Sequence, residues 1–197
     1  RCRVGHSVSR FVVHYWSTPN TGTLEFQLDQ GSWQRLNTRA SNSTSALRFH
    51  NVTAPEGEHR LTLRPVGDGN VELFGIAMER DTSGITLDSL GVVGAEASHL
   101  HDWDWPVIGP EITQRHPNLV ILWYGTNEVA NAHLNISVFE QQLSEIIARI
   151  RTAAPGVSVF MIGPPDFDLE DRSTHTWTTH PRLADVIAAE QRVARRN

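Results

Sequence analysis

The most apolar strand that the sequence predicts reads Leu119-Val120-Ile121-Leu122-Trp123-Tyr124, and it leads directly into Gly125-Thr126-Asn127-Glu128. A continuous apolar run predicts a strand that is buried on both faces, as in a parallel sheet covered by helices. We expect similar strands at residues 157–162 and at Ile85-Thr86-Leu87. These three runs indicate a parallel sheet in the second half of the chain.

Helical patterns alternate with these strands. A helix is expected over residues 138–152. It opens with Ser137 and Glu140 in the spacing of a capping box, and Pro155-Gly156 ends it. Its apolar stripe consists of Phe139, Leu143, Ile146, Ile147 and Ile150. A second helix is expected over residues 181–197, with a proline in its first turn. Strand and helix in alternation predict an α/β domain of three layers, α/β/α, over residues 84–197.

The first 80 residues have the pattern of an all-β module. Six β-branched or apolar runs recur at short intervals, separated by turn clusters such as Gly67-Asp68-Gly69-Asn70. The runs are residues 11–16, 23–28, 33–36, 46–52, 61–66 and 71–78. This spacing predicts a β-sandwich or jelly roll over residues 1–80, joined through residues 81–83 to the α/β domain.

The composition excludes several classes of function. The formal net charge is −5 and the basic residues are scattered, which argues against a nucleic-acid partner. The one cysteine, Cys2, allows neither an internal disulfide nor a thiolate metal cluster. No apolar stretch is long enough to span a membrane. We expect no metal and no cofactor, and the sequence leaves the oligomeric state open.

Chemistry is expected where strands end, because ligands bind at the carboxyl ends of the strands in an open α/β sheet. Two such ends are residues 88–95 and residues 124–128. A glycine and Asn127 placed there can direct a backbone N–H and a side-chain amide at one point, as an oxyanion hole requires. The same residue types also favour tight strand-to-helix turns. From the residues alone, both interpretations stay open.

Residues 122–128 resemble the block of SGNH (GDSL-like) hydrolases that supplies an oxyanion asparagine, and residues 87–95 resemble the block that supplies a glycine. The chain is most similar to the branch with peptidoglycan and carbohydrate O-acetylesterases, in which a carbohydrate-binding-like β-module is inserted after the first catalytic block. The resemblance implies a flavodoxin-like parallel sheet. It also implies that the N–H of Gly94 and the side chain of Asn127 are the oxyanion donors, whereas Gly91 would allow the tight turn.

The same family needs a Ser in a Gly-Asp-Ser block and an Asp and a His three residues apart. Neither pattern occurs in the 197 residues. We therefore expect an internal fragment, nearly inactive alone, of a longer serine esterase. The resemblance implies an acetylated carbohydrate or another small ester as substrate, and an extracellular or periplasmic protein.

Other polar residues could substitute for the missing groups. Ser89 in Asp88-Ser89-Leu90 echoes the family motif, but it has no preceding glycine, so we expect a turn hydroxyl. His175 and His180 follow Asp166, Asp168 and Asp171, and could form a metal site or an acid–base pair. We expect a solvated connection there instead, with His180 at the entry to the last helix.

Tryptophans could stack on a sugar ring. Trp103 and Trp105 are candidates in the α/β half. For Trp16 and Trp33 in the β-module, packing between sheets is the expected role.

Two alternatives to an esterase remain. One is a non-catalytic carbohydrate-binding protein with a degenerate SGNH domain. The other is a lipase or phospholipase of the same fold, which would need a broad apolar patch near the oxyanion site. The polar residues His99, His101, Asp102 and Asp104 do not supply such a patch.

Overall fold

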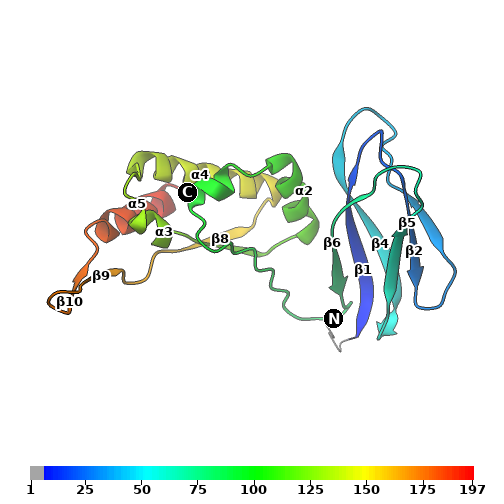
Figure 1. Cartoon of the computed structure of the whole chain (residues 1–197), viewed down its shortest axis with the longest axis horizontal. Helices are drawn as coiled ribbons and strands as arrows, with labels where there is room; N and C mark the ends of the chain where they lie inside the picture. The colour runs from blue at the N-terminus through cyan, green and yellow to red at the C-terminus, as the bar shows by residue number, and fades with distance from the viewer. Residues whose placement is uncertain (1–6) are drawn as a thin grey trace. The chain divides into compact units, whose positions relative to one another are not determined.

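The structure is a computed structural model that describes residues 7–197, so Cys2 lies outside the described residues. The chain forms two compact units, Arg1–Leu87 and Asp88–Asn197. The first contains six antiparallel strands, and the second contains the helices of the described chain (Figure 1). Each unit is described by itself.

The first unit contains two antiparallel sheets of three strands each. One sheet has the order β4-β1-β6 and the other the order β3-β2-β5. The strands are β1 (Val8–Ser17), β2 (Thr23–Leu28), β3 (Gln34–Asn37), β4 (Ala46–Gly57), β5 (Leu61–Pro65) and β6 (Glu72–Glu79). All six lie close to the runs predicted from the sequence. The classification as a jelly roll or sandwich stays a prediction.

Both sheets contribute to one core in this unit. Phe11, Phe26 and Val52 are buried in it, and apolar side chains from β2, β3 and β5 pack against them. Trp16 and Trp33 do not belong to this cluster and are half-buried. The prediction that they pack between the sheets is therefore wrong. The Trp33 ring instead lies 3.8 Å from the guanidinium carbon of Arg64, as a cation–π pair at the surface.

The second unit is built on a parallel pair of strands. In it, β7 (Leu119–Trp123) pairs with β8 (Ser158–Ile162), which confirms two of the predicted strands. The helices are α1 (Ala97–His101), α2 (Trp105–Arg115), α3 (Thr126–Ala130), α4 (Ile136–Ala153) and α5 (Leu183–Arg196). A small hairpin, β9 (Asp168–Asp171) and β10 (Thr176–Thr179), lies between β8 and α5. No helix among the described residues is long and apolar enough to cross a membrane.

The predicted apolar stripe of α4 is confirmed, because all five of its residues are at most 2% exposed. The predicted capping box is wrong. Asn135 is the N-cap, and its Oδ1 accepts hydrogen bonds from the N–H groups of Ser137 and Val138 at 3.0 and 3.2 Å. An asparagine two residues before Ser137 starts the helix earlier, since asparagine is among the best N-cap residues. Glu140 is consequently free to pair with Arg192 and Arg196 of α5.

Helices cover only one face of the parallel pair in the described residues. Leu122 is 5% exposed and belongs to the helical core, together with Val120, Val159 and Met161. On the other face, Ile121, Trp123 and Phe160 are 50–63% exposed. The prediction of strands buried on both faces and of a third layer is thus not met by residues 7–197. Alternate residues of a strand point to opposite faces, so one covered face leaves the other row exposed.

The strand predicted at Ile85-Thr86-Leu87 is also wrong. Residues 84–92 contain no strand or helix, and Ile85 and Leu87 are 99% and 83% exposed. Apolar residues form a strand only beside a partner that takes up their backbone hydrogen bonds. No strand of the described chain pairs with this segment.

Candidate functional site

The two segments expected to carry the oxyanion donors lie side by side. The side-chain amide of Asn127 donates to the main-chain oxygen of Ala95 at 2.7 Å. Asn127 lies in the first turn of α3, directly after β7, whereas Ala95 follows Gly94 and precedes α1. A contact across 32 residues therefore brings the carboxyl end of β7 to the loop that enters α1.

Gly94 adopts a left-handed conformation, with φ of +78°, that side-chain-bearing residues rarely take. The turn closes there, where the N–H of Ala95 donates to the oxygen of Val92 at 3.2 Å. The sequence placed the tight turn at Gly91, and this is corrected to Gly94. Gly94 is exposed, and among the described residues nothing accepts a hydrogen bond from its N–H. That N–H is consequently free to bind an oxygen from a ligand.

Gly125 starts α3 with φ of +99°. A Cβ at this position would lie 2.7 Å from Cδ of Pro164 and 3.0 Å from Oε1 of Glu190. The close approach of Pro164, which follows β8, and of Glu190 in α5 explains why the turn before Asn127 needs a glycine. It also fixes the direction in which α3 begins.

Glu128 is a buried residue that connects the segment of Gly94 to the turn before Asn127. Its side chain is 1% exposed, and its two carboxyl oxygens accept the N–H of Ala97 at 2.6 Å and the N–H of Gly125 at 2.8 Å. Burial raises the pKa of Glu128, while the bonds from these two N–H groups act in the opposite direction. One side chain thus holds both the start of α1 and the start of α3.

Glu190 of α5 is a second buried acid at the same place. It is 6% exposed, and a Cβ on Gly163 would lie 2.9 Å from its Oε2. Burial and the nearby Glu128 raise the pKa of Glu190 to about 8. Its Oε2 is buried without a hydrogen-bond partner among the described residues.

Sequence reasoning missed both acids, although each left a signal. Glu128 lies three residues after Gly125, the position from which a Glu reaches back to the first N–H of a helix. Glu190 interrupts the buried stripe of α5, four residues after Val186 and three before Val193. A carboxyl on an apolar stripe is rarely buried without a role.

Ser89 lies among the exposed residues 84–92, and no described histidine hydrogen-bonds to it. It therefore has no base that could activate its hydroxyl. Its neighbour Asp88 forms an ion pair with Arg115 at 2.8 Å. This ion pair anchors residues 87–95, the segment that resembles the glycine-supplying block, to α2 at the surface.

The loop with the predicted His and Asp residues forms a small hairpin, and its exposure agrees with the expected solvated connection. Residues of β9 and β10 are exposed, and the side chain of His175 at the turn is 83% exposed, 3.6 Å from a carboxyl oxygen of Glu170. His180 is confirmed at the entry to α5, where its oxygen accepts the N–H of Leu183 at 3.0 Å. Residues 7–197 hold no group of three or more potential metal ligands.

His101 binds two carboxylates, which the sequence did not predict. Its Nδ1 lies 2.7 Å from Asp102 and its Nε2 lies 2.7 Å from Glu145 of α4. Glu145 and then Asp102 raise the pKa of His101. Because both nitrogens are engaged, His101 ties α1 to α4 and is not available as a base.

The two tryptophans near His101 differ in their surroundings. Trp105 packs against the helical core and donates from Nε1 to the oxygen of His101 at 3.1 Å. Its role is therefore structural. Trp103 is half-buried, and a contact between its ring and a sugar stays a prediction.

The sequence profile of the GDSL-like lipase/acylhydrolase family matches residues 67–197, about two thirds of the chain. The chain belongs to this family. The GDSL-like match covers the whole second unit, including Gly94 and Asn127. The comparison with curated proteins gave no match.

One solved structure has a similar fold. A peptidoglycan O-acetylesterase structure superimposes with a TM-score of 0.68 at 23% identity, over 98% of this chain and 51% of that chain. The chain thus spans about half the length of that protein. A carbohydrate esterase family 2 enzyme with a carbohydrate-binding domain, from Corynascus thermopiles (Myceliophthora fergusii), matches at 11% identity over 97% and 79% of the two chains, with a TM-score of 0.33. A family 2 esterase from Clostridium thermocellum in complex with cellohexaose matches at 11% over 95% and 74%, with a TM-score of 0.35.

Proposed function

We propose that the protein is a serine esterase that removes acetyl groups from carbohydrate, with cell-wall glycan as the expected substrate, and that residues 1–197 carry its oxyanion donors. Membership of the GDSL-like family supports ester hydrolysis in general. The observation that carries the finer proposal is the bond from Asn127 to Ala95, because it holds the asparagine amide beside the loop of Gly94. An acetylated glycan is the substrate that the resemblance favours.

In the proposed reaction, a serine oxygen bonds to the acetyl carbon, and a histidine oriented by an aspartate takes the serine proton. The carbonyl electrons move to the oxygen, which becomes an oxyanion. The free N–H of Gly94 and the second amide hydrogen of Asn127 are the groups that we assign to this oxygen. Each such donor contributes roughly 3 kcal/mol in other acyl-transfer enzymes.

The intermediate then breaks its bond to the sugar oxygen, which takes the proton from the histidine and leaves as an alcohol. Water attacks the acetyl-enzyme, releases acetate and restores the serine. The 197 residues contain neither a Gly-Asp-Ser block nor an Asp-x-x-His block. We therefore propose that the serine, aspartate and histidine come from sequence outside them, and that this segment alone turns over almost no ester.

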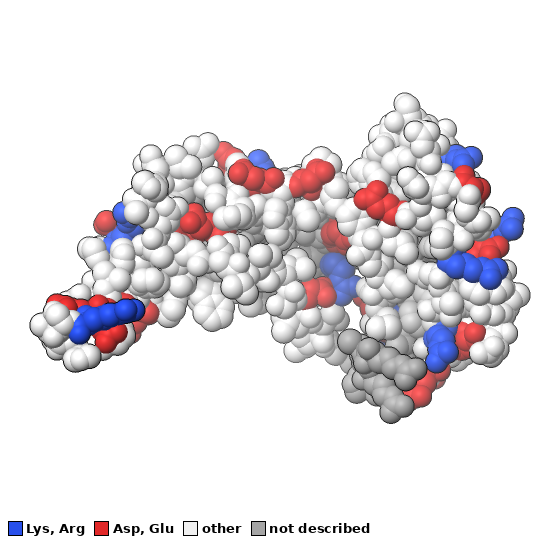
Figure 2. Space-filling model, viewed as in Figure 1, with Lys and Arg blue, Asp and Glu red and all other residues white. Residues whose placement is uncertain are grey.

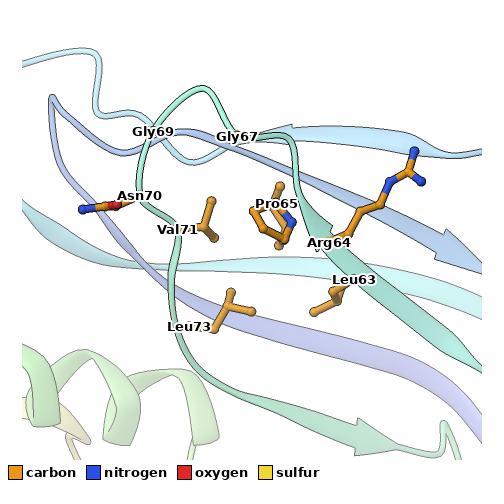
Figure 3. A pocket seen from close by; sticks show the side chains of 9 residues that line it. Leu63, Arg64, Pro65, Gly67, Gly69, Asn70, Val71 and Leu73 are labelled. Carbon is orange, nitrogen blue, oxygen red and sulfur yellow. The ribbon is translucent and has the colours of Figure 1, made fainter.

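The carbohydrate-binding alternative finds little support in the hollow of the first unit. The hollow has a volume of about 510 Å³, and Leu63, Pro65, Val71 and Leu73 contribute apolar side chains to it (Figure 3). The polar end of Asn70 points away from it. The Arg64 guanidinium is engaged with Glu25 at 2.7 Å and with the Trp33 ring. A sugar site needs convergent polar groups, which this hollow lacks.

One observation favours the lipase alternative. Directly before Gly94, the side chains of Leu90, Val92 and Val93 are 60–103% exposed, so an apolar surface does lie beside the site. These residues, rather than His99, His101, Asp102 and Asp104, supply the apolar side chains near the site. Charged side chains of both signs are scattered over the face shown in Figure 2.

The preferred length of the acyl chain distinguishes an acetylesterase from a lipase. The full-length gene product should be assayed on 4-nitrophenyl acetate and on 4-nitrophenyl decanoate. An acetylesterase should have a higher kcat/KM on the acetate, whereas a lipase should prefer the decanoate. Hydrolysis of neither ester by a folded protein with both flanking blocks would contradict the proposed function.

A further inference from the structure

The proposed oxyanion donors come from two separate segments, so their distance depends on whatever fastens one segment to the other. The bond from Asn127 to Ala95 is one link. Glu128 is the other, because its carboxyl oxygens bind the N–H groups of Ala97 and Gly125. Acyl transfer tolerates only about 0.5 Å of error in such donors. Glu128 follows Asn127 directly, and its carboxylate binds the N–H of Ala97, three residues after Gly94. Glu128 is therefore well placed to control the distance between the two donors.

Glu190 supports the bridge from the opposite side. Its Oε1 lies against Gly125, and its Oε2 lies against Gly163 at the end of β8. The carboxyl group therefore occupies the space behind the turn, where a smaller side chain would leave a void. Glu190 contacts the segment that ends in Asn127 but not the exposed side on which Gly94 lies.

The two acids differ in what their carboxyl oxygens contact. Glu128 accepts two backbone N–H groups, which stabilise a carboxylate, whereas one oxygen of Glu190 is unpartnered. Burial raises the pKa of both groups, and that of Glu190 to about 8, so we assign the proton of the pair to Glu190. The other titratable groups that influence this pair are Glu96, which raises the pKa of Glu128, and Tyr124, whose own pKa is raised by burial and by Glu128.

We propose that Glu128 and Glu190 are positioning residues of the acyl-ester site: Glu128 fastens the Gly94 loop to the Asn127 turn, and neutral Glu190 keeps that turn in place from behind. This inference rests on the proposed function and deepens it. Neither residue is assigned a contact with substrate. Their effect passes through the main chain of Gly125 and Ala97.

The ionisation of Glu190 should set an upper pH limit for activity. As the pH rises through about 8, Glu190 loses its proton and becomes a second negative charge beside Glu128. Two carboxylates cannot share a buried space without repulsion, so the turn should loosen. Activity should then fall on the alkaline side, without any change in the catalytic serine, histidine or aspartate.

The test uses the full-length gene product and 4-nitrophenyl acetate, with kcat and KM measured from pH 6 to 10. Glu128→Gln should lower kcat at least tenfold with KM nearly unchanged, since its amide nitrogen would face an N–H donor. Glu190→Ala should lower kcat several-fold at every pH. Glu190→Gln should restore kcat and abolish the loss above pH 8. Glu140→Gln, the same change at a half-buried carboxylate that pairs with Arg192 and Arg196 away from the proposed donors, is the matched control, and its kcat and pH profile should follow the wild type.

A second measurement keeps the inference independent of turnover. In residues 1–197, the amide hydrogens of Ala97 and Gly125 should exchange slowly in the wild type and at least tenfold faster in Glu128→Gln. If Asn127→Ala abolishes hydrolysis but the Glu128 and Glu190 variants keep the wild-type kcat and pH profile, the positioning proposal is wrong. If the full-length product hydrolyses no ester, the proposed function fails. Faster amide hydrogen exchange in Glu128→Gln would then show that Glu128 is a structural bridge with no role in ester hydrolysis.

Discussion

Asn127 and Ala95 are 32 residues apart in sequence, yet the side-chain amide of the first donates to the main-chain oxygen of the second at 2.7 Å. This bond uses one of the two amide hydrogens of Asn127 and leaves the other for a ligand. The same contact fixes the rotation of the amide, so the free hydrogen has a defined direction. An exposed glycine N–H lies one residue before Ala95, and we propose that it and this amide hydrogen form the pair of oxyanion donors.

The turn before Asn127 should not tolerate a side chain. In Gly125→Ala, the new Cβ would meet Pro164 at 2.7 Å and Glu190 at 3.0 Å, at a φ of +99°. Left-handed strain and overpacking together should lower the free energy of unfolding by roughly 2–5 kcal/mol, measured by urea denaturation.

Gly109→Ala is the control for this change. Gly109 lies inside α2 with open space around it, but it precedes Pro110, which disfavours a Cβ in the helical conformation and offsets the helical gain of alanine, so the free energy of unfolding should change by less than about 1 kcal/mol. Equal effects of the two substitutions would contradict the packing described for Gly125.

The start of α4 can be tested with two neighbouring substitutions. Asn135→Ala removes the oxygen that accepts the N–H groups of Ser137 and Val138, and should lower the free energy of unfolding by about 1 kcal/mol. Ser137→Ala should change it by less than about 0.5 kcal/mol, because surface changes away from caps are small. If thermal denaturation showed a larger loss of stability for Ser137→Ala than for Asn135→Ala, the result would support the capping box predicted from the sequence.

Glu190 should make stability depend on pH. Its pKa is about 8 in the folded protein and near the ordinary 4.5 in the unfolded chain, so between these values the folded state binds more protons. The free energy of unfolding therefore falls as the pH rises from 4.5 to 8, and the contribution is fully present only below 4.5. Glu190→Gln has no proton to lose. Its Tm should exceed that of the wild type by on the order of 5 °C at pH 8.

The comparison across pH distinguishes this effect from a general gain in packing. The difference in Tm between Glu190→Gln and the wild type should shrink toward pH 4.5. A difference that stays constant from pH 4.5 to 8 would show that Glu190 is not buried as a neutral acid.

Local patterns predicted much of the fold. The stripe of α4, the strands β7 and β8 and the six strands of the first unit follow from periodicity, which depends only on neighbouring residues. The failures have a different origin. Whether Ile85 forms a strand, and whether Ile121 and Phe160 are covered, depends on partners far away in sequence, which no local pattern specifies.

The candidate site was predictable in part. Gly94 and Asn127 were named from their blocks, and the structure brings their segments together. Their role as oxyanion donors stays a prediction. Glu128 and Glu190 were missed because their importance comes from burial beside each other. That relationship appears only when α3 and α5 pack against the same turn.

The central claim is that Asn127 is an oxyanion donor, and its most direct measurement is kcat/KM of the full-length product on 4-nitrophenyl acetate. Asn127→Ala should lower kcat/KM by about 10²–10³, mostly in kcat, in a protein that still unfolds cooperatively. Ser89→Ala, at an exposed residue outside the proposed chemistry, should leave it unchanged. A folded Asn127→Ala protein with the kcat/KM of the wild type would contradict the account.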